Sequence, residues 1–230
     1  MKKLSLFHKH QSANINQIAI DPKGLYEGCL LAAIAHAVTV GEYPELNYEH
    51  SWDGINYSMN DSQGCRGTIS FDEHWIVAAF RDENVLDESK DAFEFFRGAE
   101  SEIRKLAEKE TLQYLLADVD GVTRPVITTA FWGSWDALYS CHSLDDLIHN
   151  GGHILSNQLR AYPSGLKKWD ECYEFHDGQM ELIASLYQKK QKQDMGDEIL
   201  LTKEEKEILY GEIDECVESL RELNILVYES

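Results

Sequence analysis

The stretch WDGINYSMNDSQGCRGTISFDEHWIVAAFR, Trp52–Arg81, decides the fold. Apolar and polar residues alternate along 52–60 and again along 65–72, which is the period of a β-strand with one buried face. The third segment, Trp75–Phe80, is continuously apolar, as expected of a central strand covered on both faces. We therefore predict three antiparallel strands in a meander, with one face of the sheet carrying the core and the other half exposed.

The residues between the first two strands predict a tight hairpin loop. The sequence Asn60-Asp61-Ser62-Gln63-Gly64 combines side chains that hydrogen-bond their own backbone with a glycine that accepts a positive φ. The second turn is expected at Asp72-Glu73. Each residue of the meander thus has a structural explanation, so we interpret the whole stretch as a scaffold.

The rest of the chain is predominantly helical in pattern. Leu25–Val40 is apolar nearly all round, which predicts a helix buried against the meander, and Gln17–Ile20 predicts a short edge strand. The fold class is therefore α+β, an antiparallel meander sheet covered by helices. Further elements are expected as helices over 87–97 and 99–116, a strand over 125–132, and short helices beginning at Ser143 and near 153.

Tyr162-Pro163-Ser164-Gly165 is the expected domain boundary. Residues 1–162 form the sheet-and-helix domain in this prediction, and residues 163–230 form a C-terminal helical hairpin packed on it. The hairpin helices are expected over 177–192 and 202–223, the second opening on the capping box Thr202-Lys203-Glu204-Glu205. The apolar stripe of 202–223 also offers an interface for a homo-oligomer.

The charge of the chain constrains its partners. Asp and Glu number 41 against 21 Lys and Arg, a net charge of −20 in 230 residues. A field of this sign repels phosphate backbones, which disfavours nucleic-acid binding, and it attracts basic proteins. Solubility alone also accounts for such a charge.

Cysteine spacing and hydropathy indicate a cytoplasmic protein. The five cysteines are scattered and never spaced CxxC, which indicates reduced thiols and no zinc ribbon. His8-Lys9-His10 interrupts the N-terminus before an apolar run of signal-peptide length develops, and no 18 consecutive residues are apolar, so we expect no membrane association. His8 and His10 lack a third nearby ligand, and we predict neither a metal nor a cofactor.

One hypothesis for chemistry centres on Cys29, which follows a glycine near the start of the buried helix. A thiol at a helix N-terminus has a lowered pKa, the arrangement of a cysteine hydrolase or transferase. His153 is the candidate base, with His74 as the alternative, and Asp136 or Asn157 would orient the imidazole. A core cysteine is the competing interpretation.

A second hypothesis is a binding surface. Trp132 and Trp135 flank a turn that ends at Asp136, and aromatic residues near acids suit the centre of a protein interface. Packing at the end of the sheet is the alternative. The acidic residues expected to complement a basic partner are Asp82, Glu83, Asp87 and Glu88.

The segment WDGINYSMNDSQGCRGTISF, Trp52–Phe71, resembles stretches in uncharacterised bacterial proteins of the toxin-immunity and defence-accessory kind. The resemblance implies an acidic α+β binding protein and no catalytic residues. Together with the charge, it leads us to expect a non-enzymatic, immunity-type inhibitor that occludes a basic protein partner. The cysteine-dependent enzyme remains the alternative.

Overall fold

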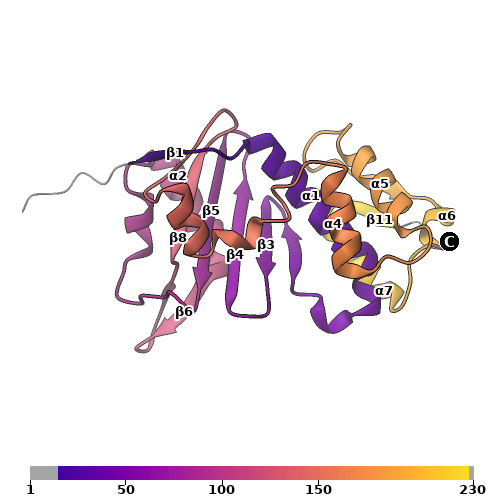
Figure 1. Cartoon of the computed structure of the whole chain (residues 1–230), viewed down its shortest axis with the longest axis horizontal. Helices are drawn as coiled ribbons and strands as arrows, with labels where there is room; N and C mark the ends of the chain where they lie inside the picture. The colour runs from indigo at the N-terminus through magenta and orange to yellow at the C-terminus, as the bar shows by residue number, and fades with distance from the viewer. Residues whose placement is uncertain (1–14, 228–230) are drawn as a thin grey trace, which may run out of the picture.

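The computed structural model describes residues 15–227, and the expected histidine pair at 8 and 10 lies outside them. Its centre is one antiparallel sheet with the strand order β1-β9-β8-β5-β4-β3-β2 (Figure 1). Helices pack on the sheet, so the α+β class is confirmed. The seven strands are β1 (Asn16–Ile18), β2 (His50–Asp53), β3 (Asn56–Asn60), β4 (Cys65–Phe71), β5 (Trp75–Asp82), β8 (Thr129–Ser134) and β9 (Leu138–Ser140).

The meander has four strands, so the prediction of three was wrong. The chain reverses after Asp53, which pairs with Asn56, and the segment 52–60 is therefore split between β2 and β3. The predicted loop at 60–64 is confirmed, since the Asp61 carboxylate accepts hydrogen bonds from the N–H groups of Gln63 and Cys65 at 2.8 and 2.9 Å. β1 lies at the sheet edge, as expected of the first apolar segment.

Both faces of the sheet centre are covered, which confirms the expectation for Trp75–Phe80, whereas the half-exposed face expected of the sheet was wrong there. Along β5, Ile76 and Phe80 belong to one apolar cluster, while Val77 and Ala79 belong to another on the opposite face. This is the alternation that a continuously apolar strand requires when it is buried twice. The second face is covered by η3 (Ala92–Phe96), α2 (Ser101–Lys109) and η4 (Thr111–Leu115).

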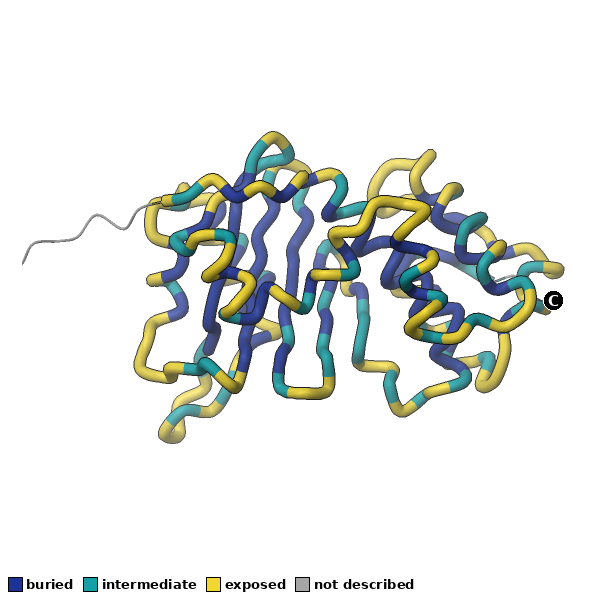
Figure 2. The backbone as a smooth tube through the Cα atoms, in the orientation of Figure 1, coloured by how far each residue is buried: buried dark blue, intermediate teal, exposed yellow. Residues whose placement is uncertain are grey.

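The predicted buried helix is α1 (Pro22–Thr39), and its burial is confirmed. Asp21 caps it by accepting from the N–H of Gly24 at 2.7 Å. The segment Pro22–Glu42 has the length and hydropathy of a membrane span, but 83% of it is buried inside the protein. Figure 2 shows the same contrast of a buried interior beneath exposed loops. Helices surround α1: α4 (Ser164–Tyr173), α5 (Gln179–Lys190) and α7 (Ile213–Glu222).

The C-terminal segment is not the predicted two-helix hairpin. The expected helix over 202–223 is interrupted, because the N–H of Glu212 donates to the carbonyl of Gly41 at 2.6 Å instead of continuing a helix. The capping box of Thr202 and Glu205 is confirmed. Besides α4, α5 and α7, the segment holds α6 (Lys203–Lys206) and a small parallel sheet of β10 (Ile199–Leu201) and β11 (Ile225–Val227).

The expected boundary at 162–165 is crossed by one continuous apolar cluster. Leu31 of α1, Phe71 of β4 and Leu186 of α5 all belong to it. The middle of the chain holds shorter elements than predicted, although the Ser143 cap is confirmed. These elements are η1 (Val40–Glu42), η2 (Pro44–Leu46), the hairpin β6 (Leu116–Val119) and β7 (Val122–Pro125), α3 (Leu144–His149) and η5 (Gly152–Leu155).

Candidate functional site

Cys29 is a core residue in the structure. It is completely buried, and burial raises the pKa of its thiol well above the usual value. Within residues 15–227 no hydrogen bond joins it to His153, which lies beside Cys65 instead. Asp136 is exposed in the turn between β8 and β9. This placement corresponds to the core-cysteine interpretation, because a nucleophile must be reached by its substrate.

The aromatic turn that was expected on the surface is packed into the two cores. Trp132 is 3% exposed and lies against Phe96, with ring centroids 5.8 Å apart. Trp135 packs on Phe71, and its indole N–H donates to the carbonyl of Asp72 at 3.0 Å. Both indoles therefore pack against other side chains at the end of the sheet.

The acids at 82–88 divide into buried and exposed members. Asp82 is buried and accepts from the N–H of Asn84 at 2.9 Å, which shapes the end of β5. Glu83 lies 2.8 Å from the guanidinium of Arg81. Asp87 and Glu88 are exposed, but Asp87 lies 4.0 Å from the ammonium of Lys90 and accepts from Ser89, which leaves Glu88 as the acid with the more open surface charge.

A pocket of about 550 Å³ opens where the free end of the sheet meets α4. This volume is in the range of small-ligand sites. The pocket wall comes from four segments that are distant in sequence: the loop after α1, the β3 end, the turn after η5, and α4. Its lining residues are Tyr43, Leu46, Glu49, His50, Met59, Asn60, Asp61, Ile154, Asn157, Gln158, Trp169, Cys172, Tyr173 and Glu174.

A chain of hydrogen bonds forms the inner wall of this pocket. The amide N–H of Gln158 donates to the Tyr57 hydroxyl at 2.9 Å, and that hydroxyl lies 2.8 Å from Nδ1 of His50. Because the tyrosine oxygen accepts from Gln158, its proton is directed to His50, and Nδ1 is the acceptor. Burial lowers the pKa of His50 well below its usual value, so the imidazole is neutral.

Two polar atoms of the pocket residues are buried without a partner in the described chain. They are Oε1 of Gln158 and Nε1 of Trp169, on side chains whose residues are 1% and 4% exposed. An unsatisfied buried donor or acceptor costs about 1–3 kcal/mol. One unmet acceptor and one unmet donor thus belong to residues that line the same pocket, and both atoms are covered by surrounding protein atoms.

The position of Gln158 depends on Gly28 in α1. A Cβ atom at position 28 would lie 1.6 Å from the carbonyl oxygen of Gln158, which is far inside van der Waals contact. Only glycine therefore allows α1 to approach the 158 backbone this closely. The approach places the Gln158 amide over Tyr57.

The charge of the pocket is one-sided. Glu49, Asp61 and Glu174 line it, and neither lysine nor arginine is among the lining residues that the structure describes. Burial, followed by the charge of Asp61, raises the pKa of Glu49. A cation that entered the pocket would relieve this repulsion.

Aromatic faces complete the pocket. Tyr173 stacks on Trp169 with centroids 5.6 Å apart and an interplanar angle of 14°. Burial and the charge of Glu49 raise the pKa of Tyr173, so its hydroxyl keeps the proton. Behind it lies His36, whose Nδ1 is 3.5 Å from the Tyr173 oxygen and whose pKa is lowered to about 4 by burial. The pocket thus combines carboxylates, aromatic rings and neutral imidazoles.

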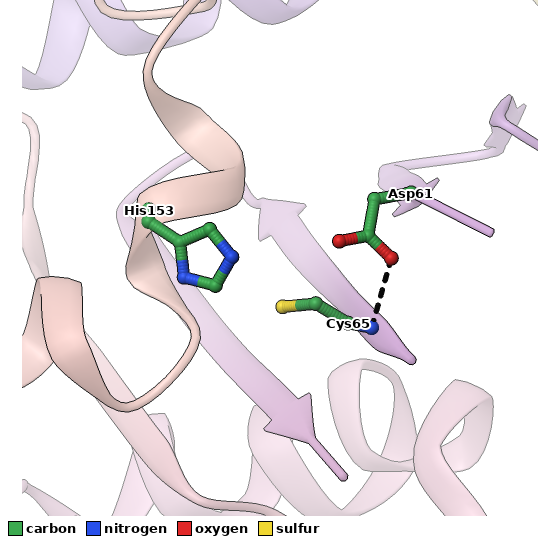
Figure 3. Close-up of side chains that lie close together, drawn as sticks. All are labelled: Asp61, Cys65 and His153. Atoms are coloured by element: carbon green, nitrogen blue, oxygen red, sulfur yellow. Dashed lines mark hydrogen bonds between the residues drawn. The ribbon is translucent and has the colours of Figure 1, made fainter. Parts of the chain in front are cut away.

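A second group of side chains adjoins the pocket at Asp61. Asp61, Cys65 and His153 each offer a ligand atom, and these atoms lie within 4.8 Å of one another (Figure 3). Burial and the charges of Asp61 and Asp82 raise the pKa of the Cys65 thiol to about 12. The thiol is therefore protonated at neutral pH, which disfavours Cys65 as a nucleophile on its own.

Sequence reasoning missed both the pocket and this group. Gln158 and Trp169 carry no local motif, and the prediction treated Asp61 as turn chemistry only. His153 was predicted as a catalytic base, but its neighbour is Cys65, 88 positions earlier in the chain. No protein-family model, curated protein or solved structure matches this chain. Function must therefore be inferred from the site itself.

Proposed function

We propose that this protein is a binding protein whose pocket receives an organic cation, namely the lysine or arginine side chain of a basic protein partner. The observation that carries the proposal is the pocket wall, with three carboxylates, three aromatic rings and no basic side chain among its described residues other than the neutral His50. Carboxylates and aromatic faces are the two groups that attract ammonium and guanidinium ions.

The unpartnered atoms refine the chemistry of the ligand. Oε1 of Gln158 requires a donor, which an ammonium or guanidinium group supplies. Nε1 of Trp169 requires an acceptor, which a backbone carbonyl beside that cationic side chain supplies. A basic residue within a polypeptide carries both a donor and an acceptor, whereas an inorganic cation could coordinate only the Gln158 oxygen and cannot accept from the Trp169 indole N–H.

The surface charge supports the same partner. A net charge of −20 steers a basic protein toward the molecule, and the pocket then fixes one of its side chains. This proposal retains occlusion of a basic partner, as in an immunity-type inhibitor. It moves the centre of the interface from the 132–136 turn to the pocket.

The test is calorimetric titration of the full chain with N-acetyl-arginine amide and N-acetyl-lysine amide, with the uncharged citrulline analogue as the ligand control. We expect at least one cation to bind tenfold or more tightly than citrulline, and its affinity to fall as salt rises. Glu49→Gln removes one carboxylate and is expected to weaken binding severalfold.

The matched control variant is Glu88→Gln, which removes an equal charge from an exposed site far along the sheet. If Glu88→Gln weakens binding as much as Glu49→Gln, the general field of the protein and not the pocket binds the cation. Equal affinity for citrulline and arginine analogues would show that the pocket does not select charge.

A further inference from the structure

Asp61, Cys65 and His153 come together from three separate elements. Asp61 lies in the loop between β3 and β4, Cys65 begins β4, and His153 lies on η5. Figure 3 shows the imidazole and the carboxylate turned toward the Cys65 side chain. One sulfur, one nitrogen and one oxygen ligand atom lie within 4.8 Å of one another.

Hydrogen bonds orient two of the three side chains in the structure. The Oδ1 atom of Asp61 accepts from the N–H groups of Gln63 and Cys65, which leaves Oδ2 available. Nδ1 of His153 lies 3.3 Å from the carbonyl of Ile148, so that nitrogen carries the proton and Nε2 has its lone pair free. Ring orientation by a backbone carbonyl is the usual second contact of a metal-ligating histidine.

The backbone before η5 is also specialised. Gly151 has φ +115°, a conformation that side-chain-bearing residues rarely adopt, and its carbonyl accepts from the Cys65 thiol at 3.4 Å. This turn brings His153 back over the start of β4. The pairing of Cys65 with His153 is therefore built by a strained turn as well as by the loop of Asp61.

We propose that Asp61, Cys65 and His153 form a zinc site. Thiolate, imidazole and carboxylate together are the mixed ligand set that Zn²⁺ accepts, and three protein ligands leave a fourth position for water. In a tetrahedral site the ligand atoms lie about 3.5 Å apart. The three ligand atoms must therefore move closer together than the observed 4.8 Å, and rotation of the exposed His153 side chain shortens these distances. On binding, the Cys65 thiol loses its proton to solvent as the Zn–S bond forms.

The site rests on Cys65 and His153, which do not line the pocket, and it shares only Asp61 with the pocket proposed for an organic cation. Asp61 lines the pocket, and Ile154, the neighbour of His153, does so too. Asp61 is half-buried and His153 is exposed, whereas Cys65 is buried, so an ion would reach the sulfur from the side of the first two residues. This departs from the expectation of no metal, which rested on ligand spacing along the sequence.

The test uses the full chain, freed of metal by a chelator and titrated with Zn²⁺ alone against a chromophoric competitor. We expect one Zn²⁺ per chain. Replacement by Co²⁺ is expected to give the near-ultraviolet charge-transfer band of a cobalt–thiolate bond. Cys65→Ser should abolish this band, and His153→Gln, at an exposed position that leaves the core intact, should lower zinc affinity tenfold or more.

Three variants serve as matched controls. Cys172→Ser removes the exposed thiol on the pocket wall, His149→Gln removes an exposed imidazole on the preceding helix, and the double variant His8→Gln/His10→Gln removes the N-terminal pair. Each is expected to keep stoichiometry and affinity unchanged. The zinc site is disproved if the cobalt–thiolate band survives Cys65→Ser, if His153→Gln binds zinc as tightly as the parent chain, or if less than one equivalent binds.

Discussion

Two segments of this chain share one combination of residue types but differ in how their tryptophans are used. Trp132–Asp136 and Trp169–Glu174 both combine tryptophan with acidic residues. In the first, the Trp135 indole N–H donates to a backbone carbonyl. In the second, the Trp169 indole N–H is more deeply buried and has no partner in the described chain. A tryptophan whose indole N–H has a hydrogen-bond partner serves packing, whereas one whose buried N–H lacks a partner is a candidate for binding. The residue composition of the segment does not distinguish the two.

The same contrast extends to the walls around the two indoles. Trp135 is enclosed by Phe71 and Tyr26, which are apolar neighbours in edge or stacked contact. Trp169 borders a pocket that includes three carboxylates, Gln158 and a neutral imidazole beside its apolar and aromatic residues. A region that carries unsatisfied polar atoms is less stable than it could be, and a ligand is the simplest compensation.

The largest expected effect is on the pocket region as a whole. Gly28→Ala places a methyl group against the Gln158 carbonyl, which must move or force α1 away. We expect the free energy of unfolding to fall by about 4 kcal/mol, above the usual range for overpacking because the obstacle is backbone. Urea unfolding measures the loss. Lys23→Ala, on the exposed face of the same helix, is the control and should change stability by less than about 0.5 kcal/mol.

The next effect is a pH dependence that the region around Trp135 lacks. The folded-state pKa of His36 is lowered to about 4, below the unfolded value of 6.5, so only the unfolded chain takes up this proton between those values. Stability is therefore lost as pH falls from 6.5 to 4, by about 3 kcal/mol from this residue. The His36→Gln variant lacks this uptake of one proton on unfolding. Its free energy of unfolding, measured by urea unfolding at several pH values in this range, should therefore depend less steeply on pH than that of the parent chain. An unchanged slope would contradict burial of a neutral His36.

A smaller effect on stability is expected when each of the two tryptophans is replaced by phenylalanine. Trp169→Phe removes an N–H without a partner and should leave stability unchanged or raise it by up to about 1 kcal/mol. Trp135→Phe breaks a hydrogen bond and should cost about 1 kcal/mol. Equal losses in thermal or urea unfolding would remove the distinction between the segments. Only Trp169→Phe is expected to weaken binding of the arginine analogue.

The smallest effect is expected at the exposed acids that sequence reasoning favoured. Asp87→Asn and Glu88→Gln lie on a surface loop and should each change stability by less than about 0.5 kcal/mol. Affinity for the arginine analogue should stay within twofold of the parent chain. A larger loss in titration would return the 82–88 segment to the binding surface.

Local patterns predicted the parts of this structure that depend on neighbours in sequence. The buried helix α1, the loop at 60–64 and the Ser143 cap follow from periodicity and turn chemistry. The split of the first strand was missed because alternation continues unbroken through the turn after Asp53. The continuous apolar run of β5 indicated that both of its faces are covered, but the pattern of one strand does not reveal which elements pack on the second face.

The candidate site could not be predicted from local sequence patterns, and the reason is physical. Gln158 reaches Tyr57 across 101 positions, and Cys65 meets His153 only because Gly151 turns the chain back. Such encounters are set by the tertiary fold, and each residue taken alone has an adequate explanation as turn, core or surface. Cys29 was a candidate because its helix position is visible in the sequence, whereas its complete burial is not.

The central position of α1 has a consequence for biosynthesis. Its apolar surface is made early in translation, but α4, α5 and α7, which cover it, follow more than 120 residues later. Until α7 emerges, a helix with the hydropathy of a membrane span has no complete cover. The nascent chain therefore depends on its last third to bury α1, and a fragment that stops at residue 162 is expected to aggregate or to recruit chaperones.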